Sequence, residues 1–130
     1  MSQKGPLLIQ IKRMFEMTAN LKIDLTEIDV LILCLALGTI EAMRSGSLPL
    51  ESGIWTLGRP KFWKPLKKLG WSSEVIKVFQ TADELEAIGT FCGQGEIDQR
   101  LTEMADILRK HLHSTSNKFW DLDLSDLTKS

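Results

Sequence analysis

The chain has 130 residues, of which 43% are hydrophobic and 25% are charged, and its net charge is −1 at pH 7. This size and composition are typical of one globular domain that buries a core without metals or disulfides, and they argue against a disordered or strongly basic protein. Near the N-terminus only residues 6–11 form a largely apolar stretch, which is too short for the core of a signal peptide, so we expect a cytoplasmic protein.

The strongest structural signal is an uncharged run, residues 30–40, with the sequence VLILCLALGTI. A helix of this length spans about 16 Å, roughly half of a bilayer's hydrocarbon core, so it is too short to cross a membrane. We predict that this run is a central apolar helix, buried by the rest of the protein and ended by Gly46. Because every periodic segment has helical spacing, we predict an all-α, compact single-domain bundle of about six to seven helices over residues 1–130.

Further helices are predicted on both sides of the central one. One covers residues 7–19, with a short extended segment as the alternative for its beginning, LLIQI. Asp24 and Thr26 are rival caps for the start of the central helix. Two short helices follow over residues 47–58 and 60–70, because glycine and proline residues mark their ends.

Two longer helices complete the periodic part of the chain. Ser73 is the predicted cap of the first, and a second capping signature at Thr81 and Glu84 leaves open a break and restart there. The last strong helix is predicted over residues 96–111, where apolar residues recur at spacings of three and four along one face.

The four tryptophans and the C-terminal segment raise separate questions. Trp55, Trp63 and Trp71 are expected to pin the middle helices to the core, because large rings contribute most burial per residue. Residues 114–130 alternate acidic and large apolar side chains, so they either dock onto the domain or stay mobile and bind another molecule. We expect Trp120, in this least core-like segment, to be the exposed binding anchor.

Charge is distributed unevenly along the chain. Residues 59–68 contain five basic side chains and no acid, whereas residues 74–106 contain eight acids against two basic side chains. One interpretation is that these are solvated helix faces that attract each other within the fold. The alternative is that the acidic segment presents a negative face to a positively charged partner.

Residues that would carry catalysis or hold a cofactor are few. His111 and His113 are two positions apart, so on a helix they point about 200° apart and cannot face one metal ion. Cys34 and Cys92 lack metal-binding spacing and are expected to be inert thiols. No phosphate-binding glycine loop or nucleophile motif is present. We therefore expect no metal, no cofactor and no enzymatic activity.

Nucleic-acid binding is the weaker alternative for the basic segment. Phe62 and Trp63 lie among its cations, and such a mixture can contact phosphates and stack on bases. The same aromatic residues have the spacing of core positions, and the protein is slightly acidic overall, unlike most nucleic-acid-binding domains.

Two stretches carry a family resemblance: LGTIEAMRSGSLPLESGIWTLGRP, residues 37–60, and LKKLGWSSEVIKVFQTADELEAI, residues 66–88. They resemble a bacterial family of small all-helical proteins of unknown function, whose members share a similar glycine and serine turn, a short helix before a proline and a late "ELE" segment. Related small helical proteins occur as immunity proteins that neutralise secreted or contact-delivered bacterial toxins. The resemblance implies a helical fold and brings no catalytic residue with it.

The resemblance and the charge pattern together lead us to expect an immunity protein that binds a cognate toxin domain and occludes its active site. Toxin domains of this kind are often cationic nucleases, RNases or DNases, so an acidic face would speed the encounter. A non-enzymatic adaptor that uses the same surfaces is the rival hypothesis, and we expect a monomer or weak homodimer. The residues expected to bind the partner are Glu84, Glu86, Asp98, Glu103, Asp106, Trp120 and Asp121.

Overall fold

The computed structural model describes residues 28–115, and within this range it contains α-helices and no strand. The all-α class is therefore confirmed for this part of the chain. The helix predicted over residues 7–19, the capping signals near residue 24 and the segment 116–130 lie outside it, so the number of helices in the whole domain stays a prediction. The described helices are α2 (Ile28–Arg44), α3 (Leu50–Leu57), α4 (Pro60–Lys68), α5 (Ser73–Cys92) and α6 (Gln94–Ser114).

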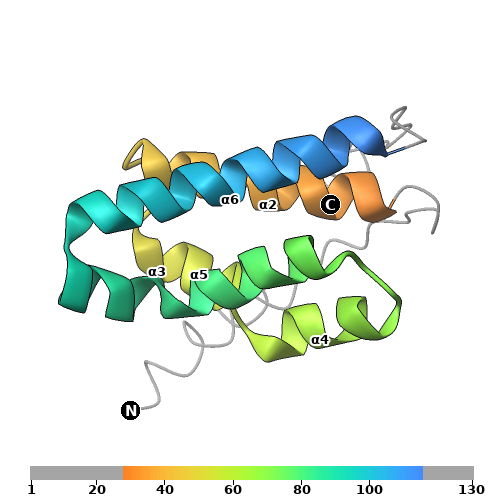
Figure 1. Cartoon of the computed structure of the whole chain (residues 1–130), viewed down its shortest axis with the longest axis horizontal. Coiled ribbons are helices and arrows are strands. Elements are labelled where there is room, and N and C mark those ends of the chain that lie inside the picture. Colours follow the sequence, from red (N-terminus) through yellow and green to blue (C-terminus); the bar gives the residue numbers. More distant parts are fainter. Residues whose placement is uncertain (1–27, 116–130) are drawn as a thin grey trace, which may run out of the picture. The chain divides into compact units, whose positions relative to one another are not determined.

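The described helices pack in two groups: α2 with α6, and α5 with α3 and α4 (Figure 1). α2 and α6 lie side by side and run in opposite directions, and α6 also packs on α5. α3 joins the two groups because it contacts both α2 and α5, and α4 packs on α5 and α3. α5 therefore has three helical neighbours, whereas α2, which contains the predicted central run, has two among the described helices.

The core is formed by one face of each helix. On α2 the buried residues have spacings of three and four, whereas Leu35 on another face is 60% exposed, so the uncharged run is buried on one face only. Leu66 of α4 is buried, and the ring of Phe62 meets that of Phe79 edge to face with 5.0 Å between centroids. The largest buried contribution comes from α5: Val75, Ile76, Val78, Phe79, Ala82 and Leu85.

The ends of α2 and α5 test the capping predictions. Gly46 has a φ of +78°, which confirms it as the left-handed residue after α2. Ser72, one residue before the predicted Ser73, caps α5 because its hydroxyl accepts a hydrogen bond from the Glu74 N–H at 3.3 Å. The alternative of a break at Thr81 is wrong: its hydroxyl donates to the Lys77 carbonyl at 2.8 Å, and α5 continues unbroken through it.

The turn between α5 and α6 consists of one residue, Gly93, which follows α5 and precedes α6. α6 begins at Gln94, two residues earlier than predicted, and ends at Ser114, three residues later. Gly89 and Gly95, on either side of this turn, lie within the two helices. Between residues 28 and 115, no helix has the length and apolar character needed to cross a membrane.

Candidate functional site

The predicted partner-binding residues on α5 and α6 are all exposed, and Trp120 and Asp121 lie outside the described residues. The exposed acids do not form one cluster. Glu84 and Glu86 are two positions apart on α5 and leave the helix about 200° apart. Glu103 lies two positions after the buried Leu101 and therefore projects from the outer side of α6, away from the core.

Glu86 lies at a shallow pocket of about 280 Å³ between α3, α5 and the beginning of α6. Glu51 of α3 is the second carboxylate in its lining, and Gln94 lines it from α6. Within residues 28–115 neither carboxylate has an ion-pair partner. The apolar part of the lining comes from Leu50, Ile54, Leu85 and Ile97. We call this feature the acid-rimmed pocket.

Asp98 lies next to this pocket through Gln94, whose side-chain amide donates a hydrogen bond to Asp98 Oδ1 at 3.0 Å. The structure therefore brings together two of the predicted residues, Glu86 and Asp98, and adds Glu51, which sequence reasoning missed. Glu51 was missed because it precedes the acidic segment by more than twenty residues, and only the packing of α3 on α5 brings it close.

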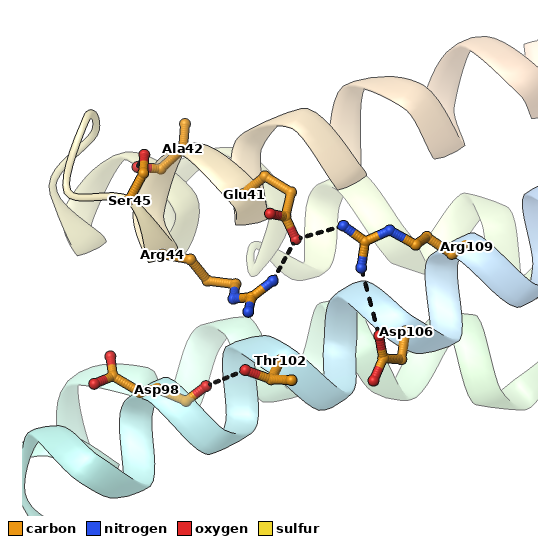
Figure 2. A network of polar contacts seen from close by, with 8 residues as sticks. All are labelled: Glu41, Ala42, Arg44, Ser45, Asp98, Thr102, Asp106 and Arg109. Atoms are coloured by element: carbon orange, nitrogen blue, oxygen red, sulfur yellow. Dashed lines mark hydrogen bonds and ion pairs between the residues drawn. The ribbon is translucent and has the colours of Figure 1, made fainter.

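Asp106 takes part in a contact between helices (Figure 2). The Arg109 guanidinium lies 3.4 Å from Asp106 Oδ1 and 3.0 Å from Glu41 Oε1, and Arg44 lies 2.7 Å from the same Glu41 oxygen. The hydrogen bond from Arg44, followed by the charges of Arg44 and Arg109, lowers the pKa of Glu41. Asp106 is thus already paired with a cation, within a network that links α6 to α2.

A second ionic contact links α5 to α6. Glu74 Oε2 lies 2.9 Å from His111 Nε2 and 3.7 Å from Lys110 Nζ. The hydrogen bond with His111, followed by the charge of Lys110, lowers the pKa of Glu74. His111 therefore faces a carboxylate, and between residues 28 and 115 no group of three or more His, Cys, Asp or Glu side chains could hold a metal ion.

The basic segment forms its own surface on α4. Its side chains Arg59, Lys61, Lys64, Lys67 and Lys68 are all exposed. None of them forms an ion pair within the described range, where Glu74, Glu96 and Asp106 of the acidic segment pair with cations of α6. The two charged segments therefore do not neutralise each other by direct contact in this part of the chain.

Trp55 corrects the expectation that all three middle tryptophans are held in the core. Its side chain is 63% exposed, and the Arg59 guanidinium lies 4.6 Å from the centroid of its ring. Trp63, by contrast, is half-buried and donates its indole N–H to the Gly58 carbonyl at 3.2 Å. The sequence contained a signal for the exposure of Trp55. The inner face of α3 is formed by Leu50, Ile54 and Leu57, and Trp55 does not lie on this face.

The described residues thus define an all-helical protein with an acid-rimmed pocket and a separate basic, aromatic surface. The chain belongs to the family described as protein of unknown function (DUF3969), whose model matches residues 24–123. No curated protein and no solved structure matches the chain. The family match includes all the described helices, so both surfaces lie within the family domain.

Proposed function

We propose that this protein is a cytoplasmic immunity protein, a non-enzymatic inhibitor that binds a cationic toxin domain, an RNase or a DNase, and occludes its active site. The observation that carries the proposal is the acid-rimmed pocket, where an apolar lining meets the carboxylates of Glu51 and Glu86. The resemblance of residues 37–60 and 66–88 to relatives of immunity proteins supports the same function.

A lysine or arginine side chain of the toxin suits this pocket chemically. Its aliphatic stem packs on Leu50, Ile54 and Ile97, and its charged head pairs with the two carboxylates. Enzymes that cleave nucleic acids need cationic side chains to hold phosphates, so an inhibitor that engages these side chains blocks the substrate path.

The exposed acids outside the pocket have a different role in this proposal. Glu84 and Glu103 lie on outer helix faces, where the charges are solvated and act over a distance. Charges of this kind raise the association rate of a cationic partner more than they slow its dissociation. Trp120 and Asp121 stay predicted contacts of the same interface.

The first experiment co-expresses the full chain with its chromosomal neighbours and measures growth. We expect a neighbouring reading frame that is toxic alone, harmless with this protein, and recovered with it as a stoichiometric complex. Recovery of a housekeeping protein with no toxicity to relieve would contradict immunity and favour the adaptor.

The second experiment compares two variants of the same helix in the purified complex. Glu86→Lys changes the pocket and is expected to raise the dissociation rate about tenfold, the equivalent of about 1.4 kcal/mol. Glu84→Lys makes the same change in charge on the other side of α5 and is expected to lower mainly the association rate. Equal dissociation rates for the two variants would rule out the pocket as the anchor.

A further inference from the structure

The surface around Trp55 and α4 has features that the proposed function does not use. α4 carries Lys61, Lys64 and Lys68 at spacings of three and four, so these cations lie along one outer stripe of the helix. Arg59 directly precedes α4, and its guanidinium covers part of the Trp55 ring. We call the surface formed by Trp55, Arg59, Lys61, Lys64 and Lys68 the α3–α4 basic surface.

The cations of this surface lack partners in the described part of the chain. No acid occurs between residues 59 and 68, and none of these side chains forms an ion pair within residues 28–115. Within this part of the chain no carboxylate neutralises these cations, even though the protein as a whole has a net charge of −1.

The exposed indole of Trp55 favours an anionic ligand that also carries a flat ring. A shallow hollow of about 290 Å³ is lined by Trp55, Thr56, Arg59, Lys61 and Phe62, so a flat ring that lies against Trp55 has the cations of Arg59 and Lys61 nearby. In a duplex the bases are already stacked on each other, and only an unpaired base offers its face to an indole. Stacking on an aromatic side chain, combined with cations along the backbone, is how proteins hold single strands without reading their sequence.

We propose that the α3–α4 basic surface binds single-stranded nucleic acid. A base stacks on the indole of Trp55 beside the Arg59 guanidinium, and the following phosphates run along Lys61, Lys64 and Lys68. Glu51 lies one turn before Trp55 on the same side of α3, so its carboxylate repels phosphates and directs the strand toward α4. Glu51 borders both regions, but the residues that hold the ligand and the ligand itself differ from those of the proposed function, so either proposal can fail without the other.

The test measures the fluorescence anisotropy of a labelled twelve-nucleotide oligouridine with the full chain at several salt concentrations. Affinity should fall with salt, because each neutralised phosphate contributes about −0.7 to the slope of log affinity against log salt. Lys64→Glu should weaken binding and reduce the steepness of this slope. The matched variant Lys77→Glu, an exposed lysine on α5, should leave both unchanged.

Substitution of Trp55 tests for base stacking separately from charge, because it leaves the charge of the surface unchanged. Trp55→Ala should weaken binding by between about 5-fold and 100-fold, whereas Trp55→Phe keeps most of the affinity because it keeps a stacking ring. Circular dichroism is expected to show wild-type folding for these variants, since Trp55 and Lys64 are both exposed. Absence of binding at 50 mM salt, or equal affinity of Trp55→Ala and wild type, would overturn the proposal. Displacement of the oligonucleotide by polyglutamate at equal charge concentration would also overturn it, in favour of an acidic protein partner.

Discussion

Gly58 follows α3, where the backbone passes close to that of α5. A Cβ atom built on this residue would lie 2.6 Å from the Asp83 nitrogen and 2.8 Å from the Asp83 Cα. Both are backbone atoms of a packed helix, so they cannot move aside as the end of a flexible side chain can. The φ of Gly58 is −81°, which any residue adopts, so glycine is needed here for space alone.

We therefore expect Gly58→Ala to lower the free energy of unfolding by about 1–3 kcal/mol through overpacking. Gly38→Ala is the matched control, because Gly38 lies within α2 and a Cβ there meets no atom of residues 28–115 within 4 Å. The control should raise stability by about 0.4–1 kcal/mol. Urea unfolding followed by circular dichroism measures both, and equal stability of Gly58→Ala and wild type would show that the approach to Asp83 is looser.

At the scale of elements, the joint between α5 and α6 depends on one backbone conformation. Gly93 has a φ of 85° and a ψ of 176°, a region that residues with a Cβ rarely occupy. The two longest described helices reverse direction through this residue, and their contact supplies much of the core.

Gly93→Ala is expected to lower the free energy of unfolding by about 1–3 kcal/mol, because alanine must hold a strained conformation or shift the helices. Gly95→Ala lies two residues on, inside α6 with open space around its Cβ, and should be neutral or slightly stabilising. Thermal unfolding of the two variants makes the comparison. If both melt at the wild-type temperature, the turn tolerates another conformation.

Some features of these elements could be predicted because they are local. The apolar stripes of α5 and α6 have the helical period within their own sequences, and Gly46 ends α2 as its position indicates. The capping signature at Thr81 was a local signal as well, but the packing of α5 favours a continuous helix there. Ala82 and Leu85 continue the buried stripe of α5 in the core, which stabilises an unbroken helix.

At the scale of the whole molecule, exposed ionic contacts connect helices that are distant in sequence. Glu41 of α2 meets Arg109 of α6, and Glu74 of α5 meets His111 of α6. The pKa of each carboxyl group is lowered from its ordinary value of 4.5. The folded state therefore binds fewer protons than the unfolded state near and below this pH, so these contacts stabilise the fold above about pH 4.5 and are lost as the pH falls through the lowered pKa.

The double variant Glu41→Gln with Glu74→Gln should accordingly be less stable than wild type at pH 7 and equally stable at pH 2. The difference should be small, because the side chains of Glu41 and Glu74 are 38% and 52% exposed and solvent screens both charges. Glu84→Gln is the control, since Glu84 has no ion-pair partner within residues 28–115. Urea unfolding at the two pH values tests this, and a difference that persists at pH 2 would mean that the glutamines disturb packing instead.

The sequence by itself determined the helical class, most helix positions and the separation of basic and acidic segments. The helical class and the helix positions depend on the spacing of apolar residues and on glycine at helix ends, which are properties of neighbouring residues. The separation of charge is a property of the sequence itself. Only the tertiary structure decided that Glu51 and Glu86 line one pocket and that Arg109 connects Asp106 of α6 to Glu41 of α2. These outcomes depend on which helix faces meet, and contacts between residues far apart along the chain leave no periodic signal in a single sequence.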